Sequence, residues 1–63
     1  MIKVLITGGS GFIGTNLVEH FASLGYEVCN LDVAKPRNTN QLKFWKKINI
    51  LDRDAVSDLF VSF

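Results

Sequence analysis

The stretch TGGSGFIG, residues 7–14, follows the apolar run IKVLIT at 2–7 and precedes a helical pattern that begins near Phe12. A short apolar run that ends at glycine is typical of a buried parallel strand. A helix that starts directly after such a turn directs free N–H groups, and the positive end of its dipole, at the turn. The sequence therefore predicts a strand–turn–helix unit whose turn binds an anionic group such as a pyrophosphate.

The glycines of this turn have separable roles. In a turn of this kind the first glycine permits the sharp change of direction, the middle one lets backbone approach a ligand, and the last lets the helix pack closely on the strand. Asp32 closes the next apolar segment, 18 residues beyond Gly14, near the ~20 expected for a carboxylate that accepts hydrogen bonds from ribose hydroxyls. A carboxylate there repels a 2′-phosphate, so NAD is favoured over NADP. The alternative is that the glycines only build a tight turn and Asp32 only ends a strand.

The rest of the chain alternates strand and helix patterns. Residues 26–32 read as a strand, 33–41 as a loop with room for one helical turn, 42–50 as a third strand and 52–63 as a terminal helix. The first helix is expected to end at Gly25 and to bury one apolar stripe: Ile13, Leu17, Val18, Phe21 and Leu24. The order β-α-β-loop-β-α predicts an α/β fold, half of a doubly wound Rossmann fold, with a three-stranded parallel sheet in the order 3-2-1.

Composition narrows the class of protein. The 63 residues allow one domain at most, and 48% hydrophobic with 21% charged residues is globular composition. A net charge of +1 argues against an electrostatic nucleic-acid binder. No apolar run reaches the ~18 residues of a membrane span and no signal-peptide pattern is present, so a cytoplasmic location is expected. Cys29 is the single cysteine, expected to be a buried thiol, and with one histidine the chain offers no zinc cluster.

The turn resembles the fingerprint of the extended short-chain dehydrogenases, the NAD-dependent epimerase/dehydratase family. That family spaces its glycines G-x-x-G-x-x-G, which Gly8, Gly11 and Gly14 match, and GFIG favours this family over others with a G-x-G-x-x-G turn. The resemblance covers nearly the whole chain and is most specific at 7–14. It implies that residues 1–63 form the first part of a dinucleotide-binding domain, a truncated Rossmann domain.

The resemblance also implies cofactor contacts. Phe12 and Ile13 offer backbone N–H groups to the pyrophosphate, and Asp32 holds the adenosine ribose. The segment INILDRDAV at 48–56 is similar to the family's GDIRDRDAL, in which the Asp meets the adenine amino group and the next Ile packs on the ring. Here those positions are Asn49 and Ile50, so a carboxylate is replaced by an amide and adenine recognition is expected to be weaker.

The family's catalytic residues have no counterpart here. It uses a Tyr-x-x-x-Lys pair with a Ser or Thr, whereas Tyr26 is the only tyrosine and Asn30 stands four residues later. We therefore predict no catalytic residue in this chain. His20 is expected on the helix surface and Tyr26 at the start of a strand. Arg37 is read as a solvated loop cation rather than a partner for a 2′-phosphate.

Three hypotheses follow: a non-catalytic NAD-binding half-module, part of an enzyme whose catalytic half lies on another chain, or an interaction fragment without a ligand. The first is favoured. In the order 3-2-1 the strand at 2–7 leaves a bare apolar edge, and such edges recruit partners. We expect a homodimer through residues 2–7, with the two edge strands either parallel or antiparallel.

Overall fold

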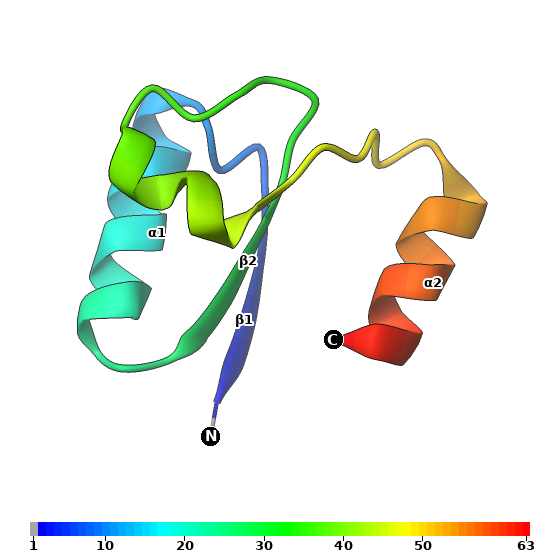
Figure 1. Ribbon diagram of the computed structural model, residues 1–63, viewed down its shortest axis with the longest axis horizontal. Helices are drawn as coiled ribbons and strands as arrows, with labels where there is room; N and C mark the ends of the chain where they lie inside the picture. Colours follow the sequence, from blue (N-terminus) through cyan, green and yellow to red (C-terminus); the bar gives the residue numbers. More distant parts are fainter. Residues whose placement is uncertain (1) are drawn as a thin grey trace.

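Three parallel strands form one open sheet that lies between helices on its two sides (Figure 1). The structure, a computed structural model, describes residues 2–63. Its elements in chain order are β1 (Lys3–Thr7), α1 (Phe12–Ser23), β2 (Glu27–Leu31), the 3-10 helix η1 (Thr39–Phe44), β3 (Trp45–Lys46) and α2 (Arg53–Ser62). Strand β2 lies between β1 and β3 and pairs with both in parallel. The predicted α/β class and the order 3-2-1 are confirmed.

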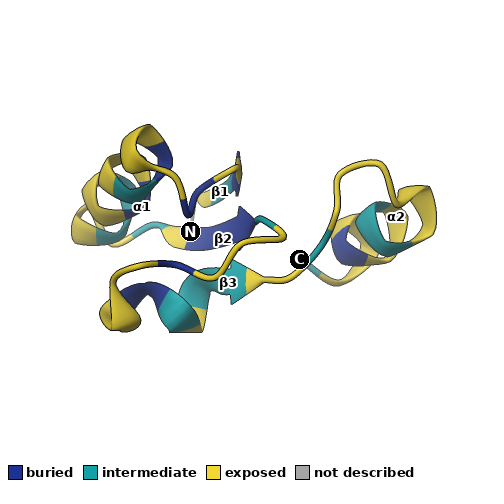
Figure 2. Ribbon diagram, turned by 90° about the horizontal axis from the view of Figure 1, so that it is seen from above, coloured by how far each residue is buried: buried dark blue, intermediate teal, exposed yellow. Residues whose placement is uncertain are grey.

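Both faces of the sheet are apolar. Side chains alternate between the faces of a strand, so Ile6 and Val28 pack with Val18 of α1, while Cys29 and Leu31 pack with Leu59 of α2 on the other face. Figure 2 shows this distribution: β2 is almost entirely buried, whereas α2 carries one buried strip on a largely exposed helix. Two small cores therefore share one central strand.

Helix α1 ends as the sequence predicts. Gly25 has a φ of +81°, the left-handed conformation that favours glycine. The N–H of Tyr26 donates to the carbonyl of Phe21 and the N–H of Gly25 to that of Ala22, which is the Schellman arrangement. The rings of Phe21 and Tyr26 stack with their centroids 6.0 Å apart. The apolar contact that accompanies this cap fixes how the chain enters β2.

The buried face of α1 differs from the predicted stripe. Gly14 and Val18 are buried against the sheet, whereas Ile13 is 73% exposed and Leu17 41% exposed. A stripe built from large apolar residues leaves out Gly14, although a residue without a side chain allows the closest approach to the strand. The helix is therefore rotated toward Gly14, and its largest aliphatic side chains lie on its flank.

The third strand is shorter than predicted. Residues 39–44 form η1, capped by Asn38, whose side chain accepts a hydrogen bond from the N–H of Asn40, and only Trp45–Lys46 pair with β2. Phe44 packs on the α1 side of the sheet and Ile48 on the α2 side. Residues 42–50, predicted as one strand, therefore comprise the end of a helical turn, two strand residues and a loop. Their apolar side chains do not share one face of the sheet.

Helix α2 begins one residue after the predicted start at 52. Asp52 is the N-cap, and its Oδ1 accepts a hydrogen bond of 3.2 Å from the N–H of Ala55. Only Leu59 of this helix is buried, and Phe60 is exposed. At the end of the chain, Lys3 donates to the carbonyl of Phe63 and lies over its ring. Among residues 2–63, none of the helices has the length and apolar character needed to cross a membrane.

Candidate functional site

The glycine turn is built by contacts of backbone with backbone. Gly8 has a φ of +70°, and its N–H donates to the carbonyl of Leu31 at 2.8 Å, which ties the turn to the end of β2. The N–H of Gly11 donates back to the carbonyl of Gly8 at 3.2 Å. A Cβ at Gly14 would lie 2.3 Å from the carbonyl oxygen of Gly8, whereas a Cβ at Gly11 would lie 3.5 Å from it. Gly8 thus permits the turn, and Gly14 permits the close packing of the helix on the turn. At Gly11 a Cβ would make only ordinary contact with the protein.

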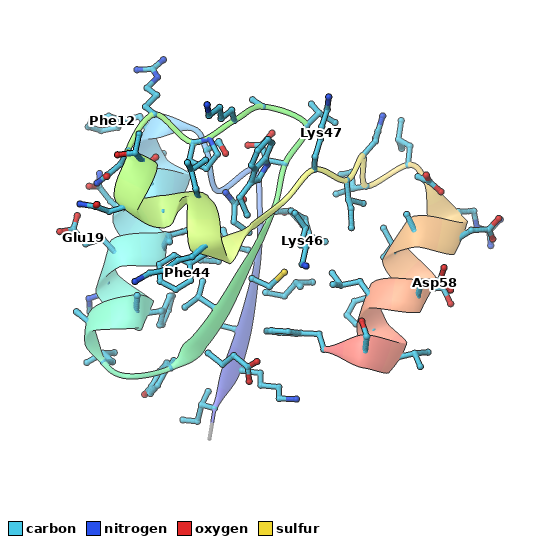
Figure 3. All side chains as sticks on the ribbon, viewed as in Figure 1. Phe12, Glu19, Phe44, Lys46, Lys47 and Asp58 are labelled. Atoms are coloured by element: carbon cyan, nitrogen blue, oxygen red, sulfur yellow. The ribbon has the colours of Figure 1, made fainter. Side chains whose placement is uncertain are left out.

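The first turn of α1 is available to an acceptor outside the helix. Gly11 is its N-cap and has no side chain to cap the helix, and the first helical hydrogen bond runs from the N–H of Thr15 to the carbonyl of Gly11. An α-helix leaves the N–H groups before that point without intrahelical acceptors, here those of Phe12, Ile13 and Gly14. The Phe12 side chain projects away from the sheet (Figure 3) and is exposed, as is that of Ile13.

Asp32 is held at the end of β2 by four hydrogen bonds. Its Oδ2 accepts from the N–H of Ser10 at 3.0 Å, and its Oδ1 accepts from the N–H of Ala34 at 3.0 Å. Its backbone carbonyl accepts from Nε1 of Trp45 at 2.8 Å, and its N–H donates to the carbonyl of Lys46. Each carboxylate oxygen retains a lone pair for another donor. The carboxylate is therefore fixed beside the glycine turn and can still accept hydrogen bonds.

A shallow cavity of about 300 Å³ lies beside Asp32. It brings together four of the residues that the sequence singles out, Gly8, Asp32, Asn49 and Ile50, and its full lining is Thr7, Gly8, Leu31, Asp32, Val33, Ile48, Asn49 and Ile50. Gly11, Phe12, Ile13 and Gly14 lie outside that lining, in the turn and at the start of α1. Apolar residues dominate the lining and Asp32 is its one charged residue, a composition suited to a flat ring joined to a polyhydroxylated group.

Asn49 is already used by its own loop. Its Oδ1 accepts a hydrogen bond of 2.9 Å from the N–H of Leu51, and its backbone carbonyl accepts one of 2.8 Å from the N–H of Asp52. The amide oxygen expected to receive a ligand therefore has one of its two lone pairs occupied. This turn also leads the chain into α2.

The structure shows site residues that the sequence reasoning missed. Ser10 and Asn30 are both buried, and Nδ2 of Asn30 donates to Oγ of Ser10 at 3.1 Å beneath the turn. A Cβ at Gly9 would lie 2.3 Å from Oδ1 of Asn30, so a glycine is needed at position 9 to make room for this amide. A polar residue within the run VCNL was the only sign of it in the sequence.

The remaining residues singled out from the sequence lie away from this site. Tyr26 stacks on Phe21 at the opposite end of α1, His20 is exposed in the last turn of that helix, and Arg37 is exposed in the loop. Cys29 is buried on the α2 side of the sheet. Burial raises the pKa of its thiol, with Lys46 opposing and Glu27 adding to the shift. Within residues 2–63, His, Cys, Asp and Glu side chains form no group of three that could hold a metal ion.

Comparison with known proteins shows the family to which this chain is similar. A family model described as the NAD dependent epimerase/dehydratase family matches residues 4–63. A probable dTDP-glucose 4,6-dehydratase of Sinorhizobium fredii is 32% identical, with 98% of this chain and 20% of the relative covered. UDP-glucose 4-epimerase 1 of Oryza sativa subsp. japonica is 33% identical, with 94% and 20% covered.

A solved structure agrees with the fold throughout. The crystal structure of a short chain dehydrogenase from Leptospira borgpetersenii with bound NAD+ superposes with a TM-score of 0.81 at 38% identity, covering 97% of this chain and 25% of that one. The chain thus spans about a fifth of the length of the curated relatives that it matches and about a quarter of the solved one.

Proposed function

This chain belongs to the NAD-dependent epimerase/dehydratase family, and we propose that it binds NAD at the glycine turn and the cavity beside Asp32. The observation that carries the proposal is the placement of Asp32. Its carboxylate is fixed by the N–H of Ser10, a residue of the turn itself, and the residue lines the cavity. A pyrophosphate site and a ribose acceptor are therefore held together by one hydrogen bond.

The adenosine diphosphate part of NAD has matching groups in this site. The N–H groups of Phe12 and Ile13, at the positive end of α1, would bind the pyrophosphate, and Gly11 leaves its approach free of a side chain. Asp32 would accept hydrogen bonds from the adenosine ribose. Ile50 would pack on the adenine ring, and Asn49 would use its remaining lone pair and its amide group toward the ring edge. When bound, NAD would supply a hydride acceptor, and these residues would hold its adenosine diphosphate part.

We further propose that Asp32 selects NAD against NADP. A 2′-phosphate would meet a carboxylate that Ser10 and Ala34 hold in place, so the repulsion cannot be relieved by rotation of the side chain. The loop that follows Asp32 carries two cations that could offer compensation, Lys35 and Arg37, and both side chains are exposed to solvent. Solvation reduces the worth of such a pair.

Binding without turnover is proposed for this chain acting alone. Tyr26 lies at the end of α1 that faces away from the turn, where its ring stacks on Phe21. It is therefore poorly placed as a proton donor to a substrate at the nucleotide site. Epimerase or dehydratase activity would use acid–base residues from outside this chain's described residues.

We also propose that a second copy of the chain completes the sheet at β1. Strand β1 pairs with β2 only, so one of its edges is open. Glu19 and Ala22 of α1 line a cavity with η1, and the helical period places Ile13, Leu17 and Leu24 on the opposite flank, above the open edge, where all three are exposed. A two-fold axis would place the open edge of β1 and this flank of α1 against the same surfaces of a second copy. A net charge of +1 gives little repulsion between two copies. Parallel and antiparallel pairing both meet this condition.

Calorimetric titration of the purified chain with NAD and with NADP tests the ligand. We expect saturable binding of NAD and binding of NADP at least tenfold weaker, and equal affinities would refute the role of Asp32. Light scattering tests the second copy: Leu17→Glu should halve the mass, whereas Val61→Glu, an exposed apolar residue on α2, should not. A folded parent chain with the mass of a monomer would overturn the dimer.

A further inference from the structure

We propose that Asn30 is a positioning residue of the nucleotide site, whose buried amide holds Ser10 and, through Ser10, fixes the glycine turn to the carboxylate of Asp32. The inference rests on the proposed function, because the site that Asn30 would position is the NAD site. It concerns a residue that touches neither the cavity nor the N-terminal turn of α1.

Asn30 lies in the centre of the sheet. Its backbone pairs with Ile6 of β1 and Trp45 of β3, and the residue is 1% exposed. Its side chain points toward α1, beneath the turn, and its Nδ2 donates to Oγ of Ser10 at 3.1 Å. Both side chains of this hydrogen bond are buried, and the bond joins the sheet to the turn.

The contact continues to the ribose carboxylate. Ser10 is 5% exposed, and its N–H donates to Oδ2 of Asp32 at 3.0 Å. Asn30 thus determines where Ser10 lies, and Ser10 determines which way the carboxylate of Asp32 turns. The amide also fills the space that a side chain at Gly9 would take. The contacts of Asn30 with Gly9 and Ser10 therefore fix the position of the turn on the sheet.

The amide of Asn30 carries a cost in stability. Its Oδ1 has no hydrogen-bond partner within residues 2–63, and a buried acceptor without a partner is unfavourable. An apolar residue of similar size at this central strand position would remove that cost. Replacing Asn30 by an apolar residue is therefore expected to keep or raise the stability of the fold and, at the same time, to lower the affinity of the site for NAD.

Asn30→Val makes that separation measurable. Valine suits a central strand and lacks the amide nitrogen and oxygen of Asn30. We expect a melting temperature equal to or above that of the parent, faster hydrogen exchange at the Ser10 amide, and NAD binding about 5- to 10-fold weaker, the loss of one neutral hydrogen bond. Ser10→Ala should weaken NAD binding by a similar factor, and adding Asn30→Val to it should cause little further loss, since both changes break one contact.

Gln41→Leu is the matched control. Gln41 is the other buried amide with an unpartnered oxygen, and its Nε2 donates to the carbonyl of Thr15 rather than to the turn. This variant should leave NAD affinity within about twofold and Ser10 exchange unchanged. Equal losses of affinity in Asn30→Val and Gln41→Leu would overturn the proposal, because they would reflect general loosening.

The two claims fail in different ways. If the parent chain does not bind NAD, the proposed function fails, and exchange at the Ser10 amide still decides whether Asn30 fixes the turn. If the parent binds NAD and Asn30→Val changes neither the exchange nor the affinity, the positioning role is wrong while the proposed function stands.

Discussion

Gly14→Ala tests whether the last glycine of the turn exists for packing. Gly14 is buried in the first turn of α1, where a Cβ would lie 2.3 Å from the carbonyl oxygen of Gly8 and 2.5 Å from Cα of Gly9. These distances are about 1 Å short of ordinary contact. The obstructing atoms belong to the backbone of the turn, so no flexible side chain can move aside.

The expected cost follows from two opposing terms. Overpacking of a well-packed region costs about 1–3 kcal/mol, and rigid backbone places this site at the upper end. Replacing glycine by alanine inside a helix returns at most about 1 kcal/mol. We therefore expect a net loss of about 2 kcal/mol in the free energy of unfolding, which in a domain of this size lowers the melting temperature by roughly 8–16 °C.

Urea denaturation of Gly14→Ala and Gly11→Ala measures the difference. A Cβ at Gly11 meets only the oxygen of Gly8, at 3.5 Å, which is ordinary contact. Gly11→Ala should therefore lose about 0.5 kcal/mol at most, the cost of a poorer N-cap, while its methyl group weakens NAD binding at the turn. A Gly14→Ala chain as stable as Gly11→Ala would refute the packing role assigned to Gly14.

Three further outcomes are expected. Asp32→Ala should weaken NAD binding by about 1.5–3 kcal/mol and bring NADP to a similar affinity, and a titration with an unchanged preference for NAD would contradict the assignment. Burial raises the pKa of Cys29, with Lys46 opposing and Glu27 adding, so the unfolded chain loses its thiol proton first and stability should fall as pH rises past about 8.5. Urea midpoints between pH 7.5 and 9.5 should show this slope for the parent beyond that of Cys29→Ala, and identical slopes would exclude it. Asp52→Ala should cost about 0.5–2 kcal/mol by removing the N-cap of α2, and an unaltered unfolding midpoint would show that this cap contributes nothing.

The glycine turn made much of the fold predictable. An apolar run, a glycine turn and a helix have one common arrangement, so the parallel order of the sheet followed from the alternation of strand and helix. Gly25 marked the end of α1 and Asp52 the start of α2, because both act through local backbone chemistry. Four of the residues that the sequence singled out, Gly8, Asp32, Asn49 and Ile50, line one cavity.

Features that depend on packing between distant segments escaped prediction. The rotation of α1 toward Gly14 follows from contact with the turn, and hydrophobicity gives glycine no weight in an apolar stripe. The 3-10 helix at 39–44 arises from the cap at Asn38, which a pattern of apolar residues does not record. Asn30 and Ser10 are 20 residues apart, so their contact exists only once β2 lies beneath the turn.

Chemical-shift mapping of backbone amides during a titration with NAD tests the central claim most directly. If NAD binds at the glycine turn, we expect saturable shifts at residues 8–14, 32–34 and 48–50, largest at Phe12 and Ile13, with α2 beyond Ala55 unaffected. Saturable shifts centred on the exposed groove of α2 at Val56 and Phe60, or no saturable shift at any amide of the turn, would contradict it.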